Sequence, residues 1–374
     1  MRVVIAGGGT AGHVFPGLAL ARALSARGHE VSFIGTERGV EARLIPAAGF
    51  RFDVVPAAPL LRKVSWTTIR APLVALRAMR AAREVVRNAD VVVGMGGYVS
   101  IPAALAAARE RVPVVLHEQN AVPGLANRML SRRARTVALS FADAEPLFPR
   151  HPGSAITVTG NPVREEILRV AEGREVLAKE GRRELDLLED RRTIVIFGGS
   201  QGALHIDRAA VGACRLLEGR SDLQVVLITG PAHLGLIERA GPGGESLTVR
   251  LFGFVERMEL VYACADLVVS RSGATTAAEV TACGLPSLLI PYPYATGRHQ
   301  EANARSLQRS GAADVLLDDQ VTGESLADRI LSLIDSPERL RSMGERARAC
   351  GRPDAAERLA DAVTAAAWRT PEAT

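Results

Sequence analysis

The chain has 374 residues, of which 47% are hydrophobic and 4% aromatic, and its formal net charge is +5. This length accommodates two domains with large cores, and many aliphatic residues with few aromatic ones favour an α/β fold over an all-β fold. The four cysteines include no Cys-x-x-Cys pair, so neither a zinc site nor a disulfide framework is indicated. The positive charge suggests an anionic partner but does not identify it.

Two segments of the sequence indicate where in the cell the protein is located. The apolar run at the N-terminus, Val3 to Ala6, is too short for the core of a signal peptide, which predicts a cytosolic protein. The uncharged stretch from Val91 to Ala108 approaches the length of a membrane span, but three glycines and a proline interrupt it. We therefore expect a strand, a glycine loop and a helix there.

Short β-rich runs alternate with helical stretches, which is the pattern of a parallel sheet with crossover helices. The first series of expected strands is Val3 to Ala6, Val31 to Ile34, Val91 to Val93, Val112 to Leu116 and Thr136 to Leu139. The second series is Ile194 to Phe197, Val225 to Thr229, Val249 to Phe252, Leu267 to Ser270 and Ser287 to Ile290. We predict two doubly wound, Rossmann-like domains, residues 1–163 and 164–374, facing each other across a cleft. The helix expected at about 353–368 could stay with the second domain or pack back on the first.

The first expected strand runs into the segment Gly7-Gly8-Gly9-Thr10-Ala11-Gly12, which fits the Gly-x-Gly-x-x-Gly pattern of dinucleotide-binding proteins. Glu37, just past the second strand, could then bind a ribose. The motif is weak evidence alone, because glycines let any anion or sugar approach the backbone and a helix start offers N–H groups. NAD binding is disfavoured because His13 directly follows the loop and a second glycine loop begins at Gly198. A local hydrogen bond at the helix start is the alternative role for His13.

Further polar segments follow the expected strands in both halves. They are Gly96-Gly97-Tyr98, His117-Glu118-Gln119-Asn120, Gly160-Asn161-Pro162-Val163-Arg164, Gly198-Gly199-Ser200-Gln201-Gly202-Ala203 and Arg271-Ser272-Gly273-Ala274-Thr275-Thr276-Ala277-Ala278-Glu279. Ligands of open α/β sheets bind at the carboxyl ends of strands. We therefore expect the segments of each half to form one wall of a crevice.

This ordered set of motifs resembles the MurG family of UDP-N-acetylglucosamine transferases, and the resemblance spans nearly the whole chain. It implies a GT-B architecture and an inverting transfer of N-acetylglucosamine from UDP-N-acetylglucosamine to undecaprenyl-pyrophosphoryl-N-acetylmuramyl-pentapeptide. The N-terminal domain would bind this acceptor and the membrane, and the C-terminal domain would hold the donor. The implied process is peptidoglycan synthesis, with cell-wall biogenesis, cell shape and cell division depending on it. Another GT-B glycolipid transferase, an NAD-dependent oxidoreductase and a non-catalytic nucleotide-sugar sensor are the alternatives.

In the first domain, the resemblance implies that Thr10, Ala11 and Gly12 border the transferred sugar. Asn120 and Arg164 would complete the donor site. Ala11 stands where a glycine is common in the family, which a small residue tolerates unless the backbone needs a positive φ.

In the second domain, the resemblance places Ser200 near the diphosphate and the main chain of Val255 on the uracil ring. Glu279 would hold the ribose diol, since one carboxylate accepts from two vicinal hydroxyls, and Gln300 would bond the sugar hydroxyls. A solvated helix glutamate and a surface amide are the respective alternatives, and the loop before Gln300 lacks the acidic residues expected of the family. The helix start that would bind the phosphates comprises Ala274, Thr275, Thr276, Ala277 and Ala278.

Inverting transfer needs a base for the acceptor hydroxyl and stabilisation of the departing UDP. His13 is our first choice for the base, because imidazole titrates near neutrality, and Glu118 is the second. Ser200, the helix starts and Arg164 would stabilise the charge on UDP. The chain contains neither an Asp-x-Asp pair nor a Walker-type Gly-Lys-Ser/Thr, so we expect no tightly bound metal and no cofactor.

The segment from Arg62 to Arg87 is strongly basic, with Glu84 as its single acid. Apolar residues at helical spacing, Ile69, Leu73 and Leu76, give it an amphipathic character. We predict that it contacts the anionic inner leaflet, which places the protein peripherally at the cytoplasmic face of the cell membrane. A solvated helix packed on the sheet is the alternative, and nucleic-acid binding is not expected, because no aromatic residues are interleaved for base stacking.

Overall fold

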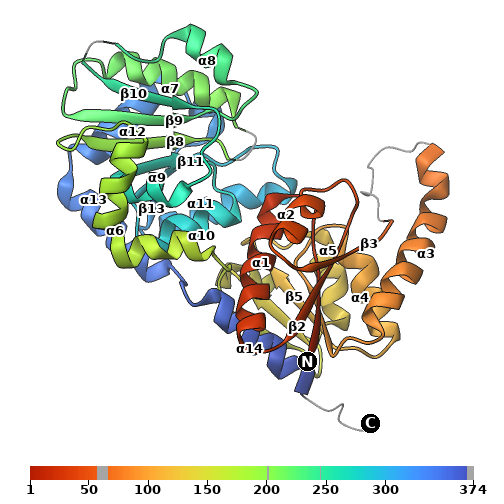
Figure 1. The fold of residues 1–374 in the computed structure, drawn as a ribbon. Helices are drawn as coiled ribbons and strands as arrows, with labels where there is room; N and C mark the ends of the chain where they lie inside the picture. The colour runs from red at the N-terminus through yellow and green to blue at the C-terminus, as the bar shows by residue number, and fades with distance from the viewer. Residues whose placement is uncertain (57–65, 200–201, 245, 369–374) are drawn as a thin grey trace. The chain divides into compact units, whose positions relative to one another are not determined.

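The computed structural model describes residues 1–56, 66–199, 202–244 and 246–368, with the backbone alone described at 66–75. The chain forms two compact units, shown in Figure 1. Unit 1 is Met1–Arg164 together with Pro353–Thr374, and unit 2 is Glu165–Arg352. Unit 1 therefore includes Arg164 and the final helix of the chain.

Unit 1 contains a seven-stranded sheet of order β3-β2-β1-β4-β5-β6-β7, in which all neighbouring strands are parallel. The strands are β1 (Arg2–Ala6), β2 (Glu30–Gly35), β3 (Arg51–Val54), β4 (Val91–Gly94), β5 (Val114–Glu118), β6 (Thr136–Leu139) and β7 (Ala155–Val158). The helices are α1 (Ala11–Ala26), α2 (Glu41–Ala47), α3 (Trp66–Val86), α4 (Ser100–Arg109), α5 (Leu125–Leu130) and α14 (Ala355–Trp368), with 3₁₀ turns η1 (Ser131–Arg133) and η2 (Ala142–Leu147).

Two cores cover the two faces of this sheet, because successive side chains of a strand point to opposite sides. Val3 and Ile5 of β1 belong to the core formed with α1, α2 and α14. Val4 of the same strand belongs to the core formed with α3 and α4. Helix α14 is part of unit 1 because Leu359 and Val363 are fully buried in the first core.

Unit 2 contains a six-stranded sheet of order β10-β9-β8-β11-β12-β13, again parallel throughout. The strands are β8 (Arg192–Phe197), β9 (Leu223–Ile228), β10 (Thr248–Phe252), β11 (Leu267–Ser270), β12 (Ser287–Leu289) and β13 (Ala313–Val315). The helices are α6 (Glu165–Glu184), α7 (Leu204–Leu216), α8 (Leu234–Ala240), α9 (Met258–Cys264), α10 (Ala274–Ala282), α11 (His299–Arg309), α12 (Gly323–Ile334) and α13 (Pro337–Cys350), with 3₁₀ turns η3 (Thr296–Arg298) and η4 (Asp318–Gln320).

The sheet of unit 2 is also covered on both faces. Ile194 and Ile196 of β8 pack with α7, α8 and α12 on one face. On the other face, the ring of Phe197 lies 6.2 Å from that of Tyr262 in α9, measured between centroids. The predicted fold class, two Rossmann-like parallel-sheet domains, is confirmed by these two units.

Candidate functional site

The strand order of each sheet reverses at one point, between β1 and β4 in unit 1 and between β8 and β11 in unit 2. In open α/β sheets, ligands bind at the carboxyl ends of the strands beside such a switch point. Ala6 of β1 pairs with Gly94 of β4, and Phe197 of β8 pairs with Ser270 of β11. Both glycine loops therefore begin at a switch point, each beside the loop of the neighbouring strand.

The glycine loop of unit 1 is held by a buried carboxylate. Oε2 of Glu41 accepts from the backbone N–H of Gly9 at 2.9 Å, and Oε1 accepts from the Thr36 hydroxyl at 2.7 Å. A Cβ added at Gly8 would lie 2.4 Å from Oε1 of Glu41, so the approach requires glycine there. Helix α1 begins at Ala11, which is not among the residues with positive φ, so alanine fits this position without strain.

His13 lies in the first turn of α1, at the edge of the switch point. Its Nδ1 lies 2.6 Å from Oε1 of Gln119, which directly follows β5. Burial lowers the pKa of His13 below its usual value, and the hydrogen bond with Gln119 opposes this shift. His13 is therefore neutral at neutral pH and has a lone pair for a proton.

The loop after β4 packs against the imidazole of His13. Gly96 and Gly97 adopt positive φ values of 89° and 77°. A Cβ added at Gly96 would lie 3.2 Å from Cε1 of His13, and one added at Gly97 would lie 3.6 Å from Cδ2. A side chain would therefore be strained at either position, and one at Gly96 would also crowd the ring of His13.

His117 and Glu118 organise the loop after β5. His117 is fully buried, and its Nε2 bonds the carbonyl of Gly160 at 3.0 Å. Burial lowers the pKa of His117 to about 4, so this ring is neutral. Oε1 of Glu118 accepts from the N–H of Asn120 at 3.0 Å, and Oε2 accepts from Asn127 at 2.9 Å.

Both oxygens of Glu118 thus accept from donors of the following loop and of α5, which leaves His13 as the better placed of the two proposed bases. Thr10 is exposed at the N-cap of α1, and Gly12 and Asn120 are partly exposed near the same strand ends. The guanidinium of Arg164 stacks on the ring of Phe15 in α1, 4.7 Å from its centroid. The structure thus gathers the predicted residues of unit 1 around α1 and the end of β5.

The segment before Arg164 contains an unusual buried amide. Asn161 is 4% exposed, and neither Nδ2 nor Oδ1 has a hydrogen-bond partner among the described residues. An unpaired amide costs free energy when it is buried, so such a group marks a place where a ligand or water completes the structure.

The glycine loop of unit 2 joins β8 to α7. Gly202 has a φ of 75°, and a Cβ there would lie 1.9 Å from the carbonyl oxygen of Thr229, so no other residue fits without rearrangement. Beside the loop, the buried carboxylate of Asp207 bonds Nδ1 of His233 at 2.8 Å. Burial raises the pKa of Asp207 to about 6, against the effect of His233. The predicted diphosphate contact Ser200 lies outside the described residues.

The first turn of α10 follows the other strand of this switch point. Gly273, which has no side chain, occupies its N-cap with extended backbone. The first N–H groups of a helix have no partner within it, and they attract anions. Ala277 is buried at this turn, and the others of the predicted set are partly exposed, namely Ala274, Thr275, Thr276 and Ala278.

Glu279 lies one turn further along α10 and is 5% exposed. Its Oε2 accepts a hydrogen bond of 2.9 Å from the hydroxyl of the buried Tyr262. Glu279 is therefore not a solvated helix glutamate, which was the alternative to a binding role.

Gln300 lies in the first turn of α11, and its Oε1 accepts from the N–H of Tyr292 at 2.9 Å. Its carbonyl accepts from the hydroxyl of Ser272, which ties α11 to the turn before α10. Within the part of the chain that the structure describes, the amide N–H₂ of Gln300 has no acceptor. Val255 is partly exposed two residues after the Gly253 turn that ends β10, next to the 64% exposed Phe254.

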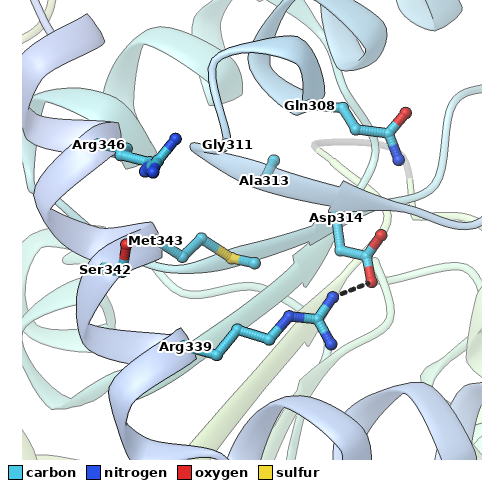
Figure 2. Close-up of a pocket in the computed structure, with 8 residues that line it drawn as sticks. All are labelled: Gln308, Gly311, Ala313, Asp314, Arg339, Ser342, Met343 and Arg346. Atoms are coloured by element: carbon cyan, nitrogen blue, oxygen red, sulfur yellow. Dashed lines mark hydrogen bonds and ion pairs between the residues drawn. The ribbon is translucent and has the colours of Figure 1, made fainter.

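Two cavities of unit 2 lie away from these residues. One has a volume of about 360 Å³ and is lined by Gln308, Gly311, Ala313, Asp314, Arg339, Ser342, Met343 and Arg346, as Figure 2 shows. The other, of about 540 Å³, is lined in part by Arg192, Asp266 and Gly284. Gly311 precedes β13 and Arg192 begins β8, so both cavities lie at the amino ends of the parallel strands. They are therefore not the site at the carboxyl ends.

Several residues that shape the site were not singled out from the sequence. Gln119 belongs to a predicted motif but the motif assigns it no role, and no sequence pattern marks Glu41, Tyr262 or Asp207. Glu41 gives a weak signal, because acidic residues are common in the first turn of a helix. The partners of these residues are distant in the sequence, so their roles follow only from the structure.

Two family models together match most of the chain. Residues 3–139 match the glycosyltransferase family 28 N-terminal domain, and residues 193–359 match the glycosyltransferase family 28 C-terminal domain. The fold and the matches thus define a class, the two-domain glycosyltransferases of family 28.

Comparison with individual relatives identifies a particular family within this class. A UDP-N-acetylglucosamine--N-acetylmuramyl-(pentapeptide) pyrophosphoryl-undecaprenol N-acetylglucosamine transferase from Halothermothrix orenii is 41% identical over 360 residues, 94% of this chain and 95% of the relative. The transferase of the same name from Moorella thermoacetica is 42% identical over 368 residues, 96% of this chain and 97% of the relative. The chain belongs to this family of transferases, the MurG family, as its motifs predicted.

Solved structures agree with this assignment. The crystal structure of Acinetobacter baumannii MurG is 30% identical, has a TM-score of 0.78, and is matched over 97% of this chain and 99% of that one. A UDP-GlcNAc 2-epimerase from Neisseria meningitidis, solved with UDP-GlcNAc, has a TM-score of 0.70 at 15% identity, with 98% of this chain and 100% of that chain covered. At this identity the second likeness shows a shared fold alone.

Proposed function

We propose that this chain transfers N-acetylglucosamine from UDP-N-acetylglucosamine to N-acetylmuramyl-pentapeptide linked to pyrophosphoryl-undecaprenol. The observation that supports this most is the similarity to MurG relatives over nearly the full length of both domains. The reaction belongs to peptidoglycan synthesis.

The donor residues are proposed mainly in unit 2. The N–H groups at the start of α10 would bind the diphosphate, together with Ser200, because an uncapped helix start favours an anion. The carboxylate of Glu279 would accept from the ribose hydroxyls, and the main chain of Val255 would contact the uracil. Gln300 would donate its free amide N–H₂ to the sugar.

Unit 1 is proposed to supply the base and further donor contacts. The acceptor hydroxyl oxygen forms a bond to C1 of the sugar while the bond from C1 to the diphosphate oxygen breaks. The imidazole of His13 takes the hydroxyl proton, and UDP leaves with the bonding electron pair. Thr10, Ala11, Gly12 and Asn120 would border the transferred sugar, and Arg164 would balance charge on the leaving group.

A transfer assay on the lipid-linked muramyl-pentapeptide tests the proposal. With UDP-N-acetylglucosamine as donor, we expect a disaccharide product and stoichiometric UDP, and with UDP-glucose a much lower kcat/KM. A preference for UDP-glucose, or transfer only to a lipid without the muramyl-pentapeptide, would instead identify a different glycolipid transferase.

We further propose that the outer face of α3 contacts an anionic membrane, which would place the protein peripherally at the cytoplasmic face. Ala78, Ala82 and Val86 form the buried face of this helix, whereas Leu76 is 45% exposed. The helix thus packs on the sheet through Ala82 and Val86, and Leu76 of the predicted apolar stripe stays outside this core, whereas the side chains of Ile69 and Leu73 are not among those described. The predicted residues before position 76 lie outside the described side chains, including Arg62 and Lys63. Among the described residues, no helix has the length and apolar character needed to cross a membrane.

Neutralising exposed arginines of α3, and Arg87 directly after it, should weaken this attachment. Arg83 forms an ion pair with Glu110, so the test uses the triple change Arg77→Gln, Arg80→Gln and Arg87→Gln. Each arginine near an anionic surface contributes about 1 kcal/mol, so partitioning onto anionic liposomes should fall on the order of 100-fold in a flotation assay. The same number of exposed arginines changed in α13, Arg341, Arg346 and Arg348, is the matched control. Equal binding by the two triple variants would reject the proposed surface.

A further inference from the structure

We infer that Gln119 is a positioning residue that fixes the proton of His13 on Nδ1 and so leaves Nε2 as the bare, basic nitrogen. The inference rests on the proposed function, because it concerns the proposed base of that reaction. It adds a residue that the family resemblance did not single out.

The first step is the orientation of the Gln119 amide. The side chain is 3% exposed, and its Nε2 donates to the carbonyl oxygen of Met95 at 2.9 Å. A carbonyl oxygen only accepts, so the N–H₂ group must face Met95. The Oε1 atom is thereby directed to Nδ1 of His13, 2.6 Å away.

The second step is the state of the imidazole. An amide oxygen also only accepts, so a hydrogen bond of this length requires a proton on Nδ1. A neutral imidazole has a single N–H, and Nε2 then holds the free lone pair. Gln119 thus selects the nitrogen that can take a proton from an acceptor hydroxyl.

The third step is rigidity, since the selection works only if neither partner rotates. The N–H of Met95 donates to the carbonyl of Ala6 at 2.8 Å, which anchors the acceptor of Gln119 to β1 at the switch point. The buried Gln119 amide is held at both ends, by the carbonyl of Met95 and by Nδ1 of His13. A flipped imidazole would lose the hydrogen bond to Gln119.

The charges around His13 agree with this role. Burial lowers the pKa of His13. Four neighbours raise it, namely the hydrogen bond with Gln119, the carboxylate of Glu118, the carbonyl of Met95 and the carboxylate of Glu41. The remaining titratable neighbour, His117, is neutral, because burial lowers its pKa to about 4. Removing the acceptor at position 119 should therefore lower the pKa of His13 further, and a carboxylate there should raise it.

The tautomer is measured directly by nitrogen-15 NMR of the full chain labelled at its seven histidines, without substrate. The His13 signal is assigned from its absence in His13→Gln. We expect wild type to show a protonated Nδ1 and a bare Nε2. Gln119→Leu, similar in volume, should populate the Nε2–H tautomer, whereas Gln119→Glu retains an acceptor and should retain the Nδ1–H form.

Kinetics supply the second measurement. We expect Gln119→Leu to lower kcat about 10-fold, because the variant loses one strong hydrogen bond to the base. KM for UDP-N-acetylglucosamine should change little. Gln119→Glu should regain most of kcat and move the acidic limb of its pH profile upward. The exposed Gln320, changed to leucine, is the matched control and should alter neither the tautomer nor kcat.

A wild-type His13 protonated on Nε2, or an unchanged tautomer in Gln119→Leu, would overturn the inference. Because this readout needs no donor or acceptor, it stands apart from the test of the proposed function. A chain that shows the expected tautomers but no transfer would reject the function and leave the role of Gln119 intact.

Discussion

Replacing His13 with glutamine should lower kcat by about 10²- to 10⁴-fold, the usual contribution of a positioned general base. The amide of glutamine still bonds at this place but takes up no proton. Binding of UDP should change little, because the proposed phosphate and ribose contacts lie in unit 2. Steady-state transfer kinetics together with calorimetric UDP binding measure the two effects separately.

The pH profile of the wild-type enzyme adds a check on the same residue. The base must be neutral to act, and burial lowers the pKa of His13. The acidic limb of kcat should therefore lie below about pH 6.5, the ordinary histidine value, and should be absent in the His13→Gln variant. His29, beyond the other end of α1, is the matched control for the substitution. A full kcat in His13→Gln would exclude His13 as the base and direct attention to Glu118.

Much of the fold could be predicted because buried parallel strands are continuous aliphatic runs in the sequence. All the expected strands are present, whereas β3, β7 and β13 were not expected. Each of these three is a short edge strand of three or four residues, and β3 and β7 are only partly buried. Short edge strands lack the apolar signal on which the prediction depends.

The position of the two glycine loops at the switch points was also predictable, because each loop follows the first strand of its half. The polar partners were not predictable in the same way. Gln119 and Met95 are 24 residues apart, and Tyr262 and Glu279 are 17 apart on different helices. Such pairs depend on which elements pack together, and spacing in one sequence does not determine this. The sequence thus indicated the loops but not the hydrogen bonds that make them rigid.

Changing Glu279 to alanine should raise KM for UDP-N-acetylglucosamine by about 10- to 100-fold, because hydrogen bonds to a charged group contribute about 1.5–3 kcal/mol. The carboxylate is proposed to accept from the ribose, and one of its oxygens is already held by Tyr262. kcat should change less than KM, since the ribose lies away from the bond that breaks. Tyr262→Phe is the matched control, because it loses the same internal hydrogen bond but keeps the carboxylate.

A nucleotide that lacks one ribose hydroxyl makes this test specific to the proposed contact. Wild type should bind 2′-deoxy-UDP more weakly than UDP, whereas Glu279→Ala should bind both nearly equally, because the acceptor of that hydroxyl is gone. The Glu279→Ala substitution and the removal of the 2′-hydroxyl together form a double-mutant cycle. The coupling free energy of this cycle measures the ribose contact, because the effect of the cavity left by alanine cancels. If Glu279→Ala discriminates the two ligands as wild type does, the carboxylate supports Tyr262 and the helix but does not hold the ribose.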